Sequence, residues 1–507
     1  MQSMTPRSFL WARARTRIAL ILLAFPSAVA LAQTETPPTP IFPDIAPICS
    51  IDSLTNLTLP NTTIDSAVLN ADDDSCRITA TVTHPPSGDQ VRIFIALPIK
   101  GWNGRFQGTG GAGMAGGFSF SLGGPLRLGY ATGATDTGHQ GMSGSFALDA
   151  NGRLNWQSIE DNAYLGIHDM TVVGKALTKA FYGRAPRYSY FVGFSTGGRQ
   201  GLMEAQRYPD DYDGIISGCP AINWQRFVLA ELWPQVVMRA GSNYVSRAKL
   251  RAATAAAIAS CGGQQGADNR VIQDPSRCTF DPGALVGTQV GDSTFTAADA
   301  DVIRKIWAGP RAQDGGFIWY GLSRGADLTA LAGRTPFPIA MDYVRYFLVQ
   351  DPKWSAASLT PDEYYFLMRQ SVEEYGDVIG TDNPDLSRFR DQGGKIIITH
   401  GQADQLIMTQ GTVDYYSRVC QQMGGQKKVM QFARLFLIPE AGHGTGGVVY
   451  DQDAIIRWVE KGVAPDKLIA REQGGSQALF PYPELAQYKG SGSADDAANF
   501  VPVLPRD

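Results

Sequence analysis

The segment Gly193-Phe-Ser-Thr-Gly197 constrains the fold of this 507-residue chain more than any other feature. It joins an apolar run at residues 188–193, typical of a buried strand, to residues 198–208, whose pattern predicts a helix. A G-x-S-x-G sequence at such a junction places a serine on a strained turn, with its hydroxyl clear of the backbone. An ordinary glycine-rich turn is the alternative interpretation. We expect Ser195 to be a nucleophile, with the Thr196 N–H facing a developing oxyanion.

Strand-like and helix-like segments alternate along much of the chain. A further helix is expected at residues 162–182, and the expected strands are residues 76–82, 91–98, 188–193, 214–218, 395–399 and 433–439. This succession predicts a mostly parallel sheet with helices on both faces. Together with the serine turn, it indicates an α/β-hydrolase fold.

The strand pattern is interrupted between residues 223 and 388, where helical runs and aromatic-rich pieces replace it. Structureless loops of that length are rare, so we expect 223–388 to be a lid domain inserted between two strands of one sheet. The catalytic domain then consists of residues 48–222 and 389–507.

A nucleophilic serine needs a base and an acid, which follow it in that fold in the chain order nucleophile, acid, base. Of the five histidines, only His400 and His443 come after Ser195. His443 lies in a glycine-rich loop just past an expected strand, where a base should lie. Asp404 follows the end of the strand at 395–399. We therefore predict a Ser195–His443–Asp404 triad, with His400 as a structural histidine.

The second oxyanion donor should come from a loop that follows an early strand. The glycine-dense residues 108–116 precede the serine, as this role requires. A nucleotide-binding interpretation of the loop is weak, because the G-x-x-x-x-G-K-[ST] pattern is missing. His139 could brace the site, although a satisfied loop histidine is the simpler interpretation.

The first 32 residues resemble a secretory signal peptide, with four arginines ahead of a short apolar run and small residues at a cleavage site. Residues 33–47 are rich in proline and threonine and are expected to be a flexible lead-in. We expect a secreted or periplasmic protein. A formal charge of −4 offers no basic field for nucleic acid or for an anionic membrane, so a small substrate is the expected partner.

Export permits disulfides among the six cysteines. We expect Cys49, Cys76, Cys261 and Cys278 to be disulfide-bonded, because the first two flank a strand-rich segment and the last two bracket a polar loop. Cys219 and Cys420 lie in apolar contexts typical of buried free thiols. Spacing alone leaves the pairing open, since six cysteines allow 15 connectivities.

Several motifs resemble the tannase and feruloyl esterase family, which also includes hydrolases of mono(2-hydroxyethyl) terephthalate. The resemblance covers nearly the whole mature chain, and the motifs that carry it include 101–106, 135–139, 181–220, 393–395 and 415–418. It implies the same triad of Ser195, Asp404 and His443. It also implies an oxyanion hole made by the N–H groups of Gly113 and Thr196, and a lid over an aromatic acyl group.

Two departures from the family pattern matter. Members typically carry bonded cysteines next to the serine and the histidine, where this chain has Phe194 and Gly444. The family's lid also holds calcium in an acidic loop, but the matching positions here are Gly262, Gln265 and Asn269, with Asp268 nearby. Because calcium prefers several carboxylates, we expect no metal and no other cofactor.

The expected function is hydrolysis of esters of phenolic acids, such as ferulate or gallate, through an acyl-enzyme on the serine. Three alternatives stay open: hydrolysis of other aromatic esters such as terephthalate or phthalate mono-esters, acyl transfer to another acceptor, and a non-catalytic binding protein on the same fold. The oligomeric state is not predicted.

Overall fold

The computed structural model describes residues 37–505, except 264–270, 447–448, 450–451 and 473–474. The expected signal peptide and the start of the lead-in therefore lie outside the described residues. Within the described part of the chain, no helix has the length and apolar character needed to cross a bilayer.

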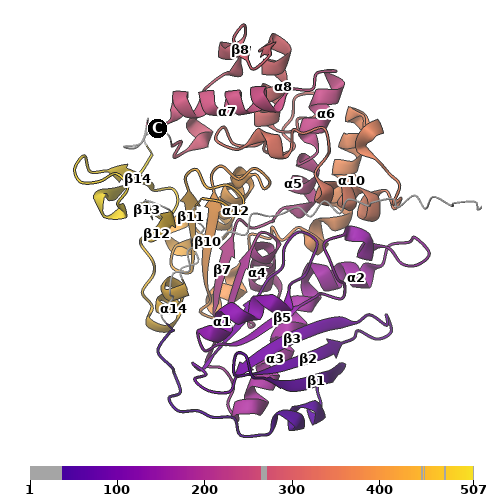
Figure 1. Cartoon of the computed structure of the whole chain (residues 1–507), viewed down its shortest axis with the longest axis vertical. Coiled ribbons are helices and arrows are strands. Elements are labelled where there is room, and N and C mark those ends of the chain that lie inside the picture. The colour runs from indigo at the N-terminus through magenta and orange to yellow at the C-terminus, as the bar shows by residue number, and fades with distance from the viewer. Residues whose placement is uncertain (1–36, 264–270, 447–448, 450–451, 473–474, 506–507) are drawn as a thin grey trace, which may run out of the picture. The chain divides into compact units, whose positions relative to one another are not determined.

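A nine-stranded sheet forms the centre of the fold, in the order β1-β2-β3-β5-β4-β6-β7-β10-β11 (Figure 1). The strands β1, β2, β3 and β5 pair antiparallel, and every pairing from β5 to β11 is parallel. The prediction of a mostly parallel sheet is thus confirmed. The strands are Thr62–Asn70, Ser75–Val82, Val91–Pro98, Arg105–Thr109, Ala131–Thr135, Tyr188–Phe194, Gly214–Gly218, Lys395–Gly401 and Ala433–Ile438.

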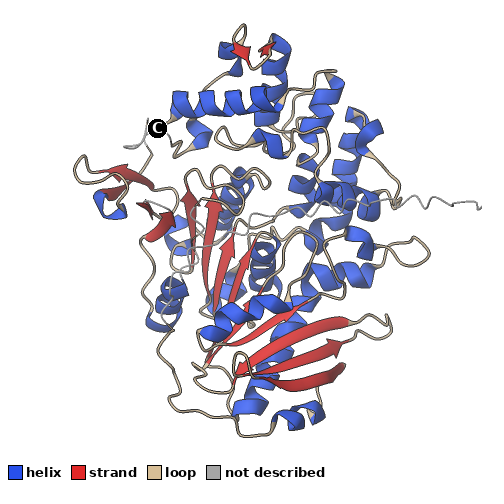
Figure 2. Ribbon diagram, viewed as in Figure 1, coloured by secondary structure: helices blue, strands red, loops and turns tan. Residues whose placement is uncertain are grey.

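Both faces of the sheet are covered by helices (Figure 2). Successive residues of β10 point to opposite faces: Ile396 and Ile398 pack with α3 (Gly166–Tyr182), α4 (Thr196–Arg207) and α12 (Thr409–Gln422), whereas Ile397 packs with α14 (Gln452–Lys461). A strand buried on both faces reads as a continuous apolar run. This explains why the Ile-Ile-Ile sequence was recognisable as a strand.

The chain between β7 and β10 is mainly helical, and residues 223–388 are called the helical insertion below. Its helices are α5 (Trp224–Ala230), α6 (Trp233–Ala240), α7 (Arg247–Cys261), α8 (Ala297–Ala308), α9 (Pro338–Asp342) and α10 (Pro361–Ile379), with α11 (Ser387–Asp391) at its end. The insertion has a hydrophobic cluster of its own, which also includes Met114 and Ala147 from the catalytic part. The two parts therefore share buried contacts.

The C-terminal residues form two small antiparallel pairs beside β11. The first joins β12 (Leu468–Glu472) to β13 (Gly475–Leu479), and the second joins β14 (Leu485–Tyr488) to β15 (Phe500–Val503). An isolated bridge between Phe436 and Pro481 ties this region to β11. The sequence did not predict these pairs, because their short strands lack a clear alternation of polar and apolar residues.

One of the expected disulfides is present. Cys261 and Cys278 are bonded, with their Cα atoms 5.5 Å apart. The expectation that Cys49 and Cys76 are disulfide-bonded is wrong for this structure, where both are free thiols. The Cys49 thiol instead donates to the carbonyl of Ala180 at 3.7 Å, while Cys76 is buried in β2. Cys219 and Cys420 are free, as expected.

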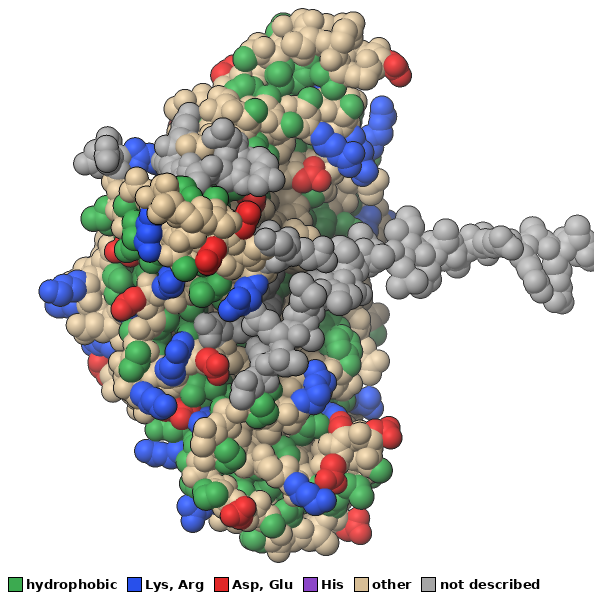
Figure 3. Space-filling view, turned by 60° about the vertical axis from the view of Figure 1, so that its left-hand side comes forward, with side chains coloured by type: hydrophobic (Ala, Val, Ile, Leu, Met, Phe, Trp, Pro, Cys, Tyr) green, Lys and Arg blue, Asp and Glu red, His purple; other side chains and the backbone are tan. Residues whose placement is uncertain are grey.

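Charged side chains of both signs are interspersed on the face drawn in Figure 3. Neither basic nor acidic residues gather there into a continuous field. This distribution agrees with the small formal charge of the chain and offers no electrostatic platform for a polyanion on that face.

A buried polar cluster fixes the start of α3 against the turn between β2 and β3. The His84 imidazole lies 2.7 Å from Asp89, 3.4 Å from Asp161 and 3.2 Å from Asp169. Burial raises the pKa of Asp161 to about 7 and that of Asp169 to about 6, and the charge of Asp89 adds to both shifts. These aspartates thus hold protons in the folded protein at pH values where an unfolded chain has lost them.

We expect Asp161→Asn to stabilise the protein relative to wild type as the pH rises from 5 to 8. A raised carboxyl pKa means that the folded state binds more protons between about pH 4 and 7, so wild-type stability falls through that window. Asparagine carries no titrating proton and removes this loss. Denaturant unfolding at several pH values measures the difference, with the exposed Asp292→Asn as the matched control. Parallel pH profiles of wild type and Asp161→Asn would contradict the prediction.

We expect Cys261→Ser/Cys278→Ser to lower the free energy of unfolding by about 2–4 kcal/mol, because the bond removes chain entropy from the unfolded state. The bonded residues are 17 positions apart. Urea unfolding measures the change. Cys420→Ser, at a half-buried free thiol, is the control for loss of a sulfur atom. An equal loss in the control would mean that the bond itself contributes little.

Candidate active site

Ser195 lies on a strained turn between β6 and α4. Its backbone has φ 59° and ψ −121°, a conformation that residues with a Cβ rarely adopt. The turn is fixed by hydrogen bonds from the Ser195 N–H to Gly218 O at 2.8 Å and from the Ala221 N–H to Ser195 O at 3.1 Å. Gly193 cannot be replaced easily, because a Cβ there would lie 2.3 Å from the carbonyl of Gly197. The predicted strand-to-helix turn is therefore present.

The three residues of the predicted triad are brought together. His443 Nε2 lies 3.0 Å from Ser195 Oγ, and His443 Nδ1 lies 2.8 Å from Asp404 Oδ2. Asp404 follows β10, and His443 lies in the loop that follows β11. The Gln405 side chain accepts a hydrogen bond from the His443 N–H at 2.9 Å and fixes that loop. Sequence reasoning missed Gln405, although it directly follows the predicted acid.

Asp404 is a buried carboxylate with many donors around it. Its Oδ1 accepts hydrogen bonds from the N–H groups of Leu406 and Ile407, both at 2.8 Å. Its Oδ2 lies 3.3 Å from His400 Nε2, in addition to the contact with His443. Burial alone would raise the pKa of Asp404, but the charge of His443 and the hydrogen bonds from both histidines hold it well below its usual value. Asp404 thus stays ionised over the whole working pH range.

His400 has the structural position that its sequence context predicted. It is fully buried, and its Nδ1 lies 2.9 Å from Thr412 Oγ1 on α12. Cys219 is also buried beside Asp404, and burial together with that charge raises the pKa of its thiol. Cys219, His400 and Asp404 form one of three groups of possible metal ligands among the described residues. The carboxylate of this group is already engaged by the two histidines and two backbone N–H groups.

Phe194 and Gly444 occupy the positions where the resembled family has bonded cysteines. The Phe194 ring lies 4.8 Å from the His443 ring, measured between centroids, so an aromatic contact joins the nucleophile strand to the base loop. Gly444 has φ 76°, a left-handed backbone conformation that glycine adopts without strain and that other residues rarely adopt.

The glycine-dense loop after β4 lies against the start of α4. Gln200 clamps the loop by accepting from the Gly111 N–H and donating to Gly116 O, both at 2.9 Å, and Thr196 Oγ1 donates to Gly113 O at 2.6 Å. Within the described residues, the N–H groups of Gly113 and Thr196 have no protein acceptor. Both predicted oxyanion donors are thus available to a ligand.

His139 and Asn162 hold the residue that follows Gly113. The Met114 carbonyl lies 2.9 Å from His139 Nε2 and accepts from Asn162 Nδ2 at 3.0 Å. Burial lowers the pKa of His139, so its neutral Nε2–H form is the donor. The ring also stacks on Phe146 at 3.9 Å. These contacts are those expected of a histidine that braces the oxyanion loop.

Asn162 is itself positioned by an irregular turn of helix. It lies in a π-helical turn, Asp161–Leu165, between α2 (Trp156–Glu160) and α3. The buried Arg199 guanidinium on α4 donates to the carbonyls of Asn162 and Ala163 at 3.1 and 2.8 Å. A helix that begins at the nucleophile thereby supports the oxyanion loop through Asn162. A buried arginine with backbone partners has no signature in a single sequence, so this role was missed.

The helical insertion reaches the site through α9. A Cβ built on Gly113 would lie 2.6 Å from Met142 Cε and 3.2 Å from Ile339 Cδ1, so these two apolar side chains flank the oxyanion loop. Asp342 accepts hydrogen bonds from the Ser143 hydroxyl and the Gly144 N–H, both at 3.0 Å. Of the aromatic residues that could have stacked on a substrate, Trp319, Tyr343 and Phe347 are core residues of the insertion, while Tyr320 and Trp354 are partly buried against it.

The loop that matches the calcium loop of the resembled family falls mostly in residues 264–270. Gln265, Asp268 and Asn269 lie outside the described residues, so the expectation of no calcium stays a prediction. The other two groups of possible metal ligands are His84 with Asp89 and Asp161, and His168 with Glu204 and Asp211. Neither group includes a residue of the triad.

Comparisons with known proteins agree with this geometry. Residues 76–503 match the family described as tannase and feruloyl esterase. A probable feruloyl esterase of Arthroderma benhamiae is 38% identical over 472 residues, covering 87% of this chain and 86% of the relative. An uncharacterized esterase of Xanthomonas campestris is 32% identical and covers 88% and 90%. Among solved structures, feruloyl esterase B from Aspergillus oryzae has a TM-score of 0.79 at 26% identity, covering 90% of this chain and 100% of that one. Tannin acyl hydrolase from Aspergillus niger has a TM-score of 0.80 at 25% identity, covering 90% and 95%.

We expect His139→Ala to lower kcat about tenfold, less than the 10²–10³-fold cost of losing an oxyanion donor outright. The Met114 carbonyl then loses one donor, and the Gly113 peptide gains freedom. His139→Gln retains an amide donor and should recover much of the rate. Steady-state hydrolysis of p-nitrophenyl acetate measures both, with thermal melting to check the fold. Equal losses in the two variants would show that the hydrogen bond is not the cause.

Proposed function

Because the chain belongs to the tannase and feruloyl esterase family, we propose that it is a secreted serine esterase that cleaves esters of phenolic acids. It is a carboxylic ester hydrolase of the tannase and feruloyl esterase type. The observation that carries the proposed mechanism is the unbroken chain of contacts from Ser195 Oγ to His443 and on to Asp404, at 3.0 and 2.8 Å. Secretion rests on the signal-like residues 1–32.

The proposed reaction is a two-step acyl transfer. His443 Nε2 takes the proton of Ser195 as the serine oxygen bonds to the ester carbonyl carbon, and the carbonyl oxygen becomes an oxyanion. The N–H groups of Gly113 and Thr196 stabilise this charge. His443 then gives the proton to the leaving alkoxide, which departs as the alcohol. Water, deprotonated by His443, attacks the acyl-enzyme and releases the acid and the free serine.

Asp404 keeps the base in a productive state. Its carboxylate accepts the Nδ1 proton of His443, which leaves the Nε2 lone pair directed at the serine, and its charge stabilises the imidazolium that forms. Two backbone N–H groups and His400 fix the carboxylate from the far side. The acid therefore does not need to move during the reaction.

The substrate class rests on two kinds of support. The relatives named above are a probable feruloyl esterase, feruloyl esterase B and tannin acyl hydrolase. Met142 and Ile339 beside the oxyanion loop give an apolar wall on which the flat ring of an acyl group can pack. We propose that the helical insertion acts as a lid that supplies this wall, with no metal ion or other cofactor in the reaction.

We expect Ser195→Ala and His443→Ala each to reduce kcat/KM by about 10³-fold or more, because both remove a group that acts in the same step. The double variant should cost little beyond either single change. Hydrolysis of methyl ferulate measures the losses, and near-UV circular dichroism confirms the fold. If the two losses multiply, the residues do not act as one unit and the proposed mechanism is wrong.

A panel of substrates separates the alternatives for the acyl group. We expect methyl ferulate and methyl gallate to be turned over with a higher kcat/KM than a terephthalate mono-ester or p-nitrophenyl acetate. The reverse order would favour the terephthalate-type function. Adding an alcohol acceptor tests acyl transfer, because a transferase forms a new ester rather than the free acid.

A further inference from the structure

A cavity lies beside the sheet edge at β11. Its volume is about 410 Å³, within the range of small-molecule sites. Segments that are distant in the chain line it: residues 273–277 and Ser323 of the helical insertion, Gln402 after β10 with the start of α12, Leu437 and Pro439 at the end of β11, and residues 478–486 with Pro505 in the C-terminal region. Ser195, Gly113 and His443 are not among its lining residues. The cavity is therefore distinct from the candidate active site.

The walls of the cavity are held in place before any ligand arrives. Gln402 donates from its amide to the carbonyl of Gln273, and the bonded Cys278 directly follows the segment 273–277. The backbone of Tyr482 is fixed on both sides, because its N–H donates to Leu435 O at 2.7 Å and its carbonyl accepts from Gln426 at 2.9 Å. A preformed site loses little free energy in ordering its walls when a ligand binds.

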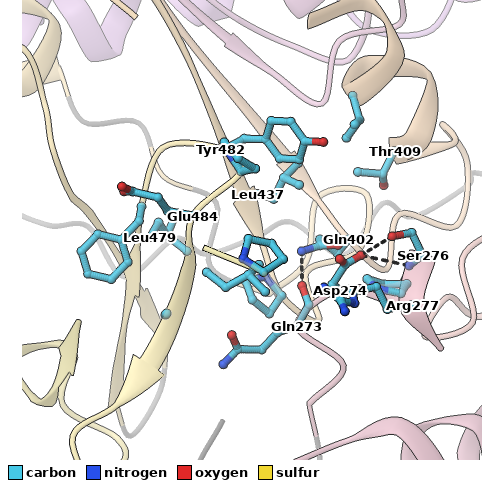
Figure 4. Close-up of a pocket in the computed structure, with 18 of the residues that line it drawn as sticks. Gln273, Asp274, Ser276, Arg277, Gln402, Thr409, Leu437, Leu479, Tyr482 and Glu484 are labelled. Carbon is cyan, nitrogen blue, oxygen red and sulfur yellow. Dashed lines mark hydrogen bonds between the residues drawn. The ribbon is translucent and has the colours of Figure 1, made fainter. Parts of the chain in front are cut away.

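The lining combines an apolar side with hydrogen-bonding groups. Figure 4 shows the Tyr482 ring above Leu437, with its hydroxyl directed toward Thr409. Asp274 and Arg277 lie across from the ring, and the carboxylate of Glu484 points away from them. Burial and the charge of Asp274 raise the pKa of Tyr482, so the hydroxyl stays protonated and can both donate and accept.

This lining excludes the simpler classes of ligand. Two carboxylates, Asp274 and Glu484, and the guanidinium of Arg277 line the cavity together, so a strongly charged anion or cation would meet a like charge. A purely apolar ligand would bury the side-chain amide of Gln410 without a partner, which is costly. A neutral ring with an apolar face and several hydroxyl groups fits both the apolar side and the mixed donors and acceptors.

From these contacts we infer that the cavity is a binding site for a neutral polyhydroxylated ring of the size of a monosaccharide. Tyr482 and Leu437 contact the apolar face of the ring, and Gln410, Asp274 and Arg277 bind its hydroxyl groups. If the proposed function holds, this ring is a sugar that forms the alcohol part of an ester substrate. Two lining residues connect the cavity to the active site, because Gln402 lies in the segment that leads to Asp404 and Pro439 in the segment that leads to His443. A free saccharide is the other source of the same chemistry.

Binding to the inactive full-length Ser195→Ala protein tests the site directly. Calorimetric titration with methyl β-D-xylopyranoside and methyl β-D-glucopyranoside should give saturable binding, whereas methoxycyclohexane and benzoate should not bind there. Tyr482→Phe and Gln410→Ala, made in the same protein, should each weaken glycoside binding about two- to twelvefold, the loss of one neutral hydrogen bond. Tyr488→Phe, in the same C-terminal region but outside the cavity, is the matched control and should leave binding unchanged.

Kinetics with active enzyme identify the source of the ring. If it is the alcohol of the substrate, Gln410→Ala should raise KM for a feruloylated methyl glycoside but not for methyl ferulate. Unchanged KM values together with lost glycoside binding would assign the site to a free saccharide. Absence of saturable glycoside binding, equal affinity in all three variants, or preferred binding of benzoate would each overturn the inference. If the wild-type protein binds the glycoside but does not hydrolyse methyl ferulate, the proposed function is wrong and the inferred binding site still stands.

Discussion

Direct contact between backbone segments, which is possible because the residues there are glycines, holds the candidate active site together. A Cβ on Gly110 would lie 2.4 Å from Gly197 Cα, and a Cβ on Gly193 would lie 2.3 Å from the Gly197 carbonyl. The loop after β4 can therefore touch the start of α4, where the Gly197 N–H donates to Gly111 O at 3.0 Å. Any side chain at these positions would separate the oxyanion loop from the nucleophile. The positions of Gly113, Thr196 and Ser195 relative to one another all depend on this contact.

Charge at the site is concentrated on one group. Glu231 and Cys219 are buried near Asp404, and burial together with the Asp404 charge raises the pKa of both. The Cys219 thiol is therefore neutral at ordinary pH and the ionised form of Glu231 is disfavoured, while the histidines and two backbone N–H groups keep Asp404 ionised. In a medium of low dielectric constant, a lone carboxylate acts strongly on the group it contacts. His443 is such a group, so the residues that keep Asp404 ionised also help to stabilise positive charge on His443.

The helical insertion contributes side chains at the edge of the site and does not form part of the serine turn between β6 and α4. Ile339 approaches Gly113, and Asp342 caps the turn at Ser143 and Gly144. Elsewhere in the insertion, residues 273–277 form a wall of the cavity beside β11. The triad and the oxyanion loop belong to the catalytic part of the chain, whereas Ile339 and Asp342 belong to the insertion.

The sequence by itself determined the elements whose signal is local. The isoleucine run of β10, the serine turn and the order of Ser195, Asp404 and His443 could be read directly, because a strand buried on both faces, a strained glycine turn and a fixed chain order each leave a pattern in neighbouring residues. The short strands β4 and β5, which are buried and rich in glycine and threonine, left no such pattern. Only the tertiary structure decided that Cys49 and Cys76 remain free, that Arg199 supports the π-helical turn at Asn162, and that distant segments of the chain enclose the cavity beside β11. The arginine contact and the cavity depend on groups that are more than thirty residues apart in the chain. The state of the two thiols depends on the orientation of their side chains in the folded protein. A single sequence carries no record of such contacts.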